Sequence, residues 1–354
     1  MSVSIRVTAY QHEIAILQHV DEKGGLWGTR GRHLLHSMDG GDWMEIAAFP
    51  RAFPRDAFAF SRLSARAFRA DKANFYLNAG GRGIGIRSGQ VYRLTEPGAL
   101  EPWFSIQGDT VLHGGICEDD QGWTYFGEYF MNPDRGEVRI WRMSPDLSNY
   151  ECAYIFPAGS IRHVHGLYRD TFRPASLWVT AGDFEGECYF YRTADRFQSL
   201  ERIGDGTQLW RAVRLFFTPD YITWLTDSHM EQNYACRMHR ETHKLEQGQP
   251  LPGSGWYGIA ATDGWYIAFT TVEPGEAIQR MESLVLVSRD GFVWQEAAAF
   301  RKDIWRPMKV FKYGVISAPT GVMDSQSLWM SGEGLVGLDG VSAAFRIIEE
   351  GGRR

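Results

Sequence analysis

A short pattern that recurs at multiples of about 50 residues constrains this chain more than any other feature of its sequence. The pattern is Ser/Thr-x-Asp, followed by a turn and then an aromatic residue. Its four clear copies begin at Ser37, Ser144, Thr193 and Ser288. Apolar segments typical of β-strands flank each copy, so each one predicts two strands joined by a turn. The Asp side chain can accept backbone N–H bonds and close such a turn.

The spacing also predicts how many units the chain contains. Degenerate copies are expected near residues 90, 240 and 337, where the sequence again favours a strand and a turn. Seven units of about 50 residues then account for the whole chain of 354 residues. Four strands in a repeat of this length are typical of a β-propeller blade. We therefore predict one all-β domain over residues 1–354, a seven-bladed β-propeller of four-stranded antiparallel blades, with six or eight blades as alternatives. For residues 64–72 and 231–245 the sequence is equally compatible with short helical turns, strands or loops.

Composition agrees with this fold and excludes several classes of protein. Aromatic residues make up 14% of the chain and there are 39 glycines, which favour strands and turns respectively. The formal net charge of −6 argues against a nucleic-acid partner. The four cysteines show no CxxC spacing and are expected to be reduced and mostly buried. With no long apolar run, neither membrane insertion nor a signal peptide is predicted. The expected location is the cytoplasm, with export possible if the chain is processed.

The repeated turn resembles the Asp box, or BNR repeat, of sialidases and many other propellers. The resemblance covers four turns well and three poorly, and each copy is about one residue shorter than the usual box. It implies a propeller fold and a structural, non-catalytic role at the blade rim for Asp39, Asp146, Asp195 and Asp290. The chain also resembles uncharacterised BNR-like propeller proteins with Gly-Glu-Tyr, His-x-His and Glu-Gln-Asn-Tyr segments, a group that brings no assigned activity.

A second series of residues recurs once per unit, where the innermost strand of each blade is expected to begin. Inner strands line the central channel of a propeller, and ligands usually bind at one of its mouths. The series consists of Arg66, His113, His163, Arg211, Tyr257 and Arg306. His165 falls on the same strand face as His163 because side chains alternate. Three tryptophans each precede a member of the series: Trp210, Trp256 and Trp305.

These residue types suit an anionic, sugar-like ligand. Arg can bind a carboxylate through a bidentate fork, and His and Tyr exchange protons near neutral pH. Carboxylates follow the predicted second strands at Glu128, Asp183 and Asp227, at the same mouth or at the opposite one. Each residue also has an ordinary structural interpretation: a histidine hydrogen-bonded in the core, an arginine paired between blades, or a carboxylate that caps a turn.

The set of inner His, Tyr and Arg residues is similar to the site of propeller polysaccharide lyases. In those enzymes Arg neutralises a uronate, and His or Tyr moves the protons of a β-elimination. This architectural resemblance implies an acidic glycan or oligosaccharide as partner. It implies acid–base roles for His113, His163, His165 and Tyr257. It implies substrate binding by Arg66, Arg211, Arg306, Trp210, Trp256, Trp305, Glu128, Asp183 and Asp227.

Three other interpretations stay open. His163 and His165, with His113 or a carboxylate, could bind Zn²⁺ or Mn²⁺, although no spacing fixes a third ligand and no cofactor is predicted with certainty. The propeller could instead bind a glycan or a protein without catalysis. A sialidase-like glycoside hydrolase is a weaker alternative, because the Arg-Ile-Pro motif of that family is absent. The oligomeric state is left open.

Overall fold

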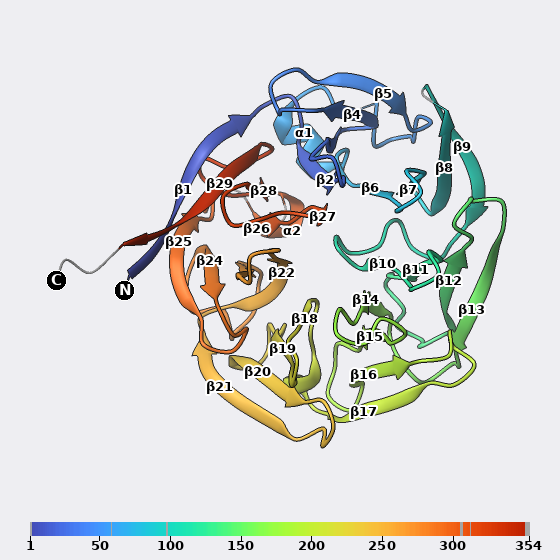
Figure 1. Cartoon of the computed structure of the whole chain (residues 1–354). Coiled ribbons are helices and arrows are strands. Elements are labelled where there is room, and N and C mark those ends of the chain that lie inside the picture. Colours follow the sequence, from blue (N-terminus) through green and yellow to red (C-terminus); the bar gives the residue numbers. More distant parts are fainter. Residues whose placement is uncertain (1, 58, 97, 305–306, 312, 351–354) are drawn as a thin grey trace.

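Seven antiparallel sheets stand around a central channel in the computed structural model (Figure 1). The structure describes residues 2–57, 59–96, 98–304, 307–311 and 313–350. Five of the sheets contain four successive strands in antiparallel order; of the other two, one combines strands from both ends of the chain and one has an added parallel strand. The predicted seven-bladed propeller is therefore confirmed, and the six- and eight-bladed alternatives are excluded.

The strands of blades 1 to 4, from the channel outward, have the following bounds. Blade 1 contains β2 (Ile16–Val20), β3 (Leu26–Arg30), β4 (His33–Ser37) and β5 (Met44–Ala48); blade 2 contains β6 (Asn74–Leu77), β7 (Gly83–Arg87), β8 (Gln90–Glu96) and β9 (Ala99–Ser105); blade 3 contains β10 (Ile116–Glu118), β11 (Thr124–Gly127), β12 (Val138–Met143) and β13 (Tyr150–Phe156); blade 4 contains β14 (Val164–Arg169), β15 (Leu177–Ala181), β16 (Cys188–Thr193) and β17 (Glu201–Gly206).

Blades 5 to 7 follow the same plan. Blade 5 contains β18 (Leu215–Phe217), β19 (Tyr221–Leu225), β20 (Asn233–His239) and β21 (Leu245–Leu251); blade 6 contains β22 (Ser254–Ala260), β23 (Tyr266–Thr271), β24 (Glu282–Ser288) and β25 (Gln295–Arg301); blade 7 contains β26 (Val315–Ser317), β28 (Leu328–Glu333), β29 (Ser342–Glu350) and β1 (Ser2–Gln11). A two-residue strand, β27 (Thr320–Gly321), pairs in parallel with β2.

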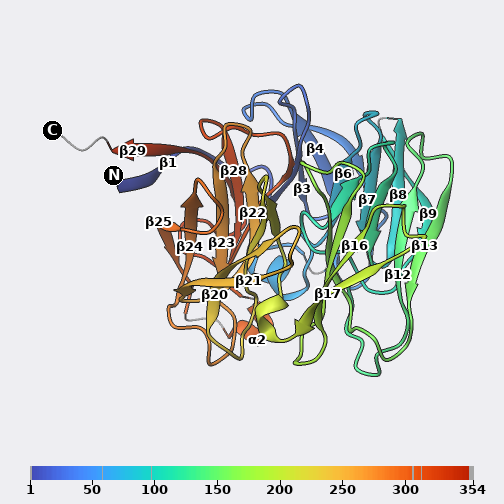
Figure 2. The same ribbon diagram turned by 60° about the horizontal axis from the view of Figure 1, so that its bottom comes forward.

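The two ends of the chain close the ring. β1 pairs with β29 in antiparallel register, from Ser2 opposite Glu350 to Gln11 opposite Ser342. Both views show these two strands side by side (Figure 1, Figure 2). Blade 7 is therefore built from both ends of the sequence. Its outer strand β1 is hydrogen-bonded to β29 and continues along the chain into β2 of blade 1, so it joins the last blade to the first.

The four clear repeat copies form the turns between the third and fourth strands of blades 1, 3, 4 and 6, and each Ser or Thr hydroxyl donates to the Asp two residues later. In the last copy, Asp290 accepts the backbone N–H groups of Phe292 and Val293 at 2.9 Å each. Trp294 is buried, donates to the carbonyl of Gly291 at 3.1 Å, and packs against Phe216 of blade 5. The predicted structural role of the repeated Asp is confirmed for these turns.

One predicted inner strand is wrong. Arg66 lies on a helix, α1 (Arg62–Ala67), within the connection between blades 1 and 2. Ser61 begins this helix with a capping box shared with Ser64, so local capping overrides the strand spacing. Residues 231–245, in contrast, contribute to strands β20 and β21.

The other helices are short and lie between blades, as α2 (Met308–Phe311) and the 3₁₀-helix η1 (Gln208–Trp210). None of the helices in the described part of the chain is both long enough and apolar enough to cross a membrane. All four cysteines are free thiols, and three of them are buried.

Candidate functional site

The antiparallel blades bring the start of each inner strand next to the end of the second strand. Asp183 follows β15 by two residues, and Asp227 follows β19 by two. Asp183 lies beside His165, the second residue of the inner strand β14, and Asp227 lies beside Arg211, which precedes the inner strand β18, as their ion pairs show. These two carboxylates therefore lie at the same mouth as the predicted His and Arg series.

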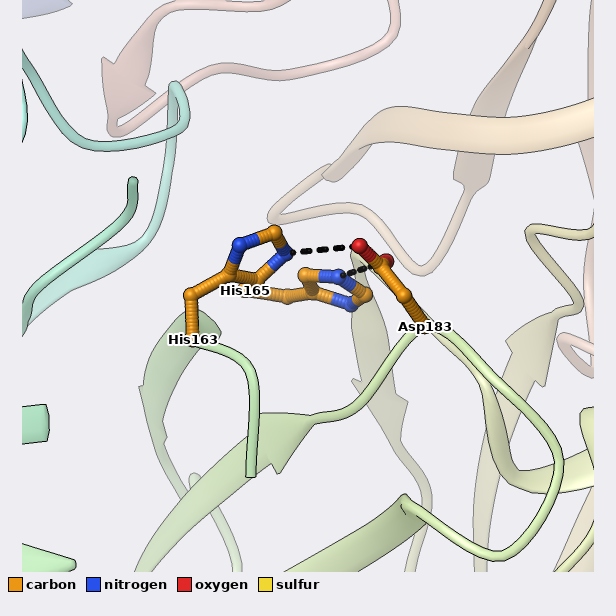
Figure 3. Close-up of side chains that lie close together, drawn as sticks. All are labelled: His163, His165 and Asp183. Atoms are coloured by element: carbon orange, nitrogen blue, oxygen red, sulfur yellow. Dashed lines mark hydrogen bonds and ion pairs between the residues drawn. The ribbon is translucent and has the colours of Figure 1, made fainter. Parts of the chain in front are cut away.

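The centre of the site is a carboxylate between two imidazoles (Figure 3). Nε2 of His165 lies 3.0 Å from Oδ1 of Asp183, and Nε2 of His163 lies 3.3 Å from Oδ2. All three side chains are buried. The Nδ1 atoms point the other way: that of His163 lies 2.9 Å from the carbonyl of Phe130, and that of His165 lies 3.1 Å from the carbonyl of Ala212.

The backbone contacts determine which ring nitrogen carries the proton. A carbonyl oxygen only accepts, so each Nδ1 must be the N–H donor. Each Nε2 then directs a lone pair at the Asp183 carboxylate, unless it carries a second proton or a cation lies between them. One ligand atom from each of His163, His165 and Asp183 lies within 4.8 Å of the others, as a divalent cation requires. Backbone acceptors on Nδ1 are also usual behind metal-ligating histidines. The three residues therefore fit a divalent cation.

Two guanidinium groups hold Asp183 in place. Nη1 of Arg162 lies 2.6 Å from Oδ2, and Nη2 of Arg211 lies 3.2 Å from Oδ1. Burial opposes ionisation of Asp183, but its close contacts with the imidazoles of His163 and His165 outweigh it and hold the pKa of the carboxyl well below its usual range. Asp183 is therefore a permanent anion at neutral pH.

Two further acidic residues, Asp227 and Glu273, lie near Arg211. Nε of Arg211 is 3.4 Å from Oδ2 of Asp227, and the indole of Trp256 donates to Oδ1 at 2.6 Å. Burial raises the pKa of Asp227 to about 7, although the charge of Arg211 favours the ionised form. Burial also raises the pKa of Glu273, which accepts a 2.6 Å hydrogen bond from Ser254. The site thus contains two guanidiniums, those of Arg162 and Arg211, and three carboxyl groups, those of Asp183, Asp227 and Glu273. This excess of acidic groups favours the binding of additional positive charge, as a proton or a cation.

Half-buried side chains form the outer part of the site. The ring of Tyr129 lies 4.3 Å from that of His163, and Nδ1 of His229 lies 3.4 Å from Nη1 of Arg211. Burial raises the pKa of the Tyr129 phenol, and Asp183 and Asp227 add to this effect, so Tyr129 stays protonated. Burial and the charge of Arg211 lower the pKa of His229. Arg162 and Trp256 are half-buried as well.

His113 and Tyr257 lie further along the channel. Their ring centroids are 5.9 Å apart, and both residues line a cavity that opens toward the other end of the inner strands. Burial raises the pKa of Tyr257 well above its usual range. The structure thus separates the predicted acid–base residues into the pair His163 and His165 and the deeper pair His113 and Tyr257.

Several predicted site residues lie elsewhere. Arg66 is fully buried and forms ion pairs with Asp303 at 2.6 Å and Asp339 at 3.4 Å, so it does not join Arg211 at Asp183. The indole of Trp210 packs in the core between the rings of Phe190 and Trp224.

Glu128 is also buried, and it accepts N–H groups of Gln107, Arg139 and Trp141, the capping role noted as its structural alternative. Trp305 and Arg306 lie outside the described residues.

Four residues of the site were missed in the sequence, among them His229, which follows Asp227 by two residues. Glu273 follows β23 by two residues and so obeys the same rule as Asp183 and Asp227. Arg162 directly precedes His163, and Tyr129 directly follows Glu128 in the sequence. A search that extended the carboxylate series by one more blade would have found Glu273.

No protein-family model and no curated protein matches this sequence. Solved structures similar to this chain include a streptogramin B lyase, with a TM-score of 0.57, 13% identity and 98% of each chain covered. An oligogalacturonate lyase in complex with manganese has a TM-score of 0.54 and 10% identity over 97% of this chain and 89% of that chain. YCF48 bound to D1 peptide has a TM-score of 0.53 and 12% identity over 99% of this chain and 97% of that chain. At these identities the similarity shows the propeller fold.

Proposed function

We propose that this chain catalyses β-elimination on a uronate-containing glycan or oligosaccharide, at the site around Asp183. The observation that carries the proposal is the convergence of two imidazoles and two guanidiniums on one buried point of the channel mouth. Such a reaction needs a base for the proton next to a carboxylate and positive charge to stabilise the carbanion that forms there.

The residues divide between these tasks. His163 removes the C5 proton of the uronate, and the electron pair of that C–H bond forms the C4=C5 double bond. The C4–O4 bond breaks, and Tyr129, whose ring lies 4.3 Å from that of His163, protonates the leaving oxygen. Arg162 and Arg211 bind the uronate carboxylate, which makes the C5 proton more acidic. Both of these arginines now contact Asp183, so the substrate competes with an internal carboxylate.

A divalent cation at the site would be held by His163, His165 and Asp183. When bound, it would supply further positive charge for the carboxylate of the substrate. The similarity to two propellers described as lyases, one in complex with manganese, supports the proposal at the level of the fold.

The direct test is an ultraviolet assay for the unsaturated uronate product with a panel of acidic oligosaccharides, namely oligogalacturonate, alginate and heparin fragments. We expect turnover of at least one of them in the absence of added metal. His163→Ala should lower kcat by about 10²-fold or more, as expected for loss of an acid–base group. The matched control is His33→Ala, which removes a half-exposed histidine of blade 1 that pairs with Glu45.

The alternative is a non-catalytic propeller that binds a glycan or a protein. It is favoured by the burial of His163, His165 and Asp183, and by a similar fold in YCF48 bound to D1 peptide. Binding of an oligosaccharide without any unsaturated product, and with equal affinity in His163→Ala, would support this alternative and refute the lyase.

A further inference from the structure

A cavity of about 860 Å³ occupies the channel at the mouth opposite Asp183. It is lined by the residues that end the inner strands β10, β14, β18 and β22, namely Glu118, Arg169, Phe217 and Ala260. The site around Asp183 lies where β14 and β18 begin, so His113 and Tyr257 stand between the two. This volume is typical of pockets for small organic ligands.

Arg214 is the most unusual residue of this cavity. Its guanidinium forms neither an ion pair nor a hydrogen bond with any residue that the structure describes, and its buried Nε has no partner there. It lies instead over two aromatic rings, with Cζ 5.4 Å from the centroid of Tyr168 and 5.6 Å from that of Phe216. Burial lowers the pKa of Arg214, which reflects the cost of enclosing this charge without an anion.

The carboxylates around the cavity do not neutralise Arg214, because they have partners of their own. Glu118 accepts a 2.7 Å hydrogen bond from Tyr76 and two from the backbone of Ala79. Asp119 accepts from Tyr125 at 3.0 Å and pairs with Arg196 at 3.1 Å.

Arg169, at the end of β14, lies within 4.0 Å of no carboxylate oxygen among the described residues, although its charge acts on Glu118 from a greater distance. The cavity thus holds two arginines whose charges are not matched by a carboxylate within ion-pair distance.

We propose that this cavity binds a small organic carboxylate through a bidentate contact with Arg214. A guanidinium fork matches the geometry of a carboxylate, and the anion would satisfy donors that nothing in the described chain satisfies. The apolar part of the ligand would pack among Leu215, Phe216 and Ile259, which also line the cavity. A monoanion is favoured over a dianion, because Arg169 is exposed to solvent, whereas Arg214 alone combines an unmatched charge with a buried, unpartnered Nε. This inference does not depend on the proposed lyase activity.

Isothermal titration calorimetry on the whole protein tests the inference with three probes of similar size: benzoate, its neutral amide benzamide, and phenyl phosphate. We expect benzoate to bind, phenyl phosphate to bind more weakly, and benzamide to bind at least about tenfold more weakly than benzoate. Arg214→Met should weaken benzoate binding by at least about tenfold. The matched control Arg173→Met removes an arginine that pairs with the exposed Glu241, and it should bind benzoate like the unmodified protein.

A second variant keeps the test decisive if Arg214→Met does not fold. Ala260 is exposed at the cavity mouth, so Ala260→Trp should narrow the entrance, leave the fold intact and weaken benzoate binding. The inference is overturned if benzoate does not bind, if benzamide binds equally well, or if phenyl phosphate binds more tightly. It is also overturned if Ala260→Trp, or a folded Arg214→Met, binds benzoate unchanged.

Discussion

The indole N–H of Trp256 donates a 2.6 Å hydrogen bond to Oδ1 of Asp227, which joins the inner strand of blade 6 to the end of the second strand of blade 5. This bond and the ion pair with Arg211 hold Asp227 in a buried position. Its pKa there is about 7, so the protonated and ionised forms are close in free energy at neutral pH. Asp227 is therefore the carboxylate of the site whose charge changes nearest neutral pH.

Replacement of Asp227 should change how stability depends on pH. Because the pKa of Asp227 is raised to about 7 in the folded protein, the folded state binds a proton that the unfolded state has released between about pH 4 and 7. Its contribution to stability is fully present below about pH 4 and is lost as the pH rises through 7. Relative to Asp227→Asn, the free energy of unfolding of the unmodified protein should fall by on the order of a few kcal/mol between pH 5 and pH 8.

Urea unfolding at several pH values measures this difference. The exposed Asp42 provides the control, since Asp42→Asn should leave the pH dependence unchanged. If Asp227→Asn and the unmodified protein show the same slope of unfolding free energy against pH, the assignment of a neutral Asp227 is wrong.

Divalent cations should stabilise the protein through the site around Asp183. A ligand that binds only the folded state raises its stability in proportion to the logarithm of ligand concentration. We expect Mn²⁺ or Zn²⁺ to raise Tm progressively, and EDTA to reverse the effect. His165→Ala removes one of the three candidate ligands and should abolish the rise in Tm.

Metal content of the dialysed protein, measured by mass spectrometry, provides a readout independent of Tm. His243→Ala is the matched control, because His243 lies on the far side of blade 5, 3.9 Å from Glu201. An equal rise in Tm for His165→Ala and the unmodified protein would place the cation elsewhere.

The rim tryptophan of blade 6 should contribute strongly to stability. Trp294 is 4% exposed, and its ring packs 5.5 Å from that of Phe216 in the neighbouring blade. Trp294→Ala should lower the unfolding free energy by about 3–5 kcal/mol, as expected for loss of a buried aromatic side chain. The adjacent Val293 is 58% exposed, so Val293→Ala should change it by less than about 0.5 kcal/mol. Equal effects of the two substitutions would show that the turn does not hold the blades together.

A disulfide across the ring closure should stabilise the whole propeller. Ser4 lies opposite Ile348 in the pairing of β1 with β29. A Ser4→Cys, Ile348→Cys double variant would link the two ends of the chain and constrain the unfolded state, with an upper limit of about 5 kcal/mol from loop entropy. We expect a higher Tm under oxidising conditions and a return to the original Tm after reduction. A Tm that is unchanged by oxidation, with the disulfide confirmed by mass spectrometry, would mean that strain in the folded state cancels the entropic gain.

The fold was largely predictable because its signal is local. Each repeated turn needs a hydroxyl, an Asp and an aromatic residue at fixed offsets, as Ser288, Asp290 and Trp294 show. Strand spacing then gave the number of blades. The same reasoning failed at Arg66, because the connection between blades 1 and 2 contains a capped helix whose length does not follow the repeat.

The site was only partly predictable, since spacing along the chain does not say which way a side chain points. His163 and His165 were placed together by strand alternation, and they do meet at Asp183. Trp210 has the same relation to Arg211 as Trp256 has to Tyr257, yet its indole turns into the core, whereas that of Trp256 reaches Asp227. This choice depends on packing between neighbouring blades, which the repeat alone does not specify.

The pairing of β1 with β29 has a consequence for synthesis on the ribosome. Strand β1 is made well before its partner β29, so the edge of β1 stays open while the intervening blades are translated. An open strand edge invites pairing with other chains. Nascent copies of this protein on one messenger are therefore at risk of exchanging β1 with each other, and the speed of translation relative to blade folding sets how often that happens.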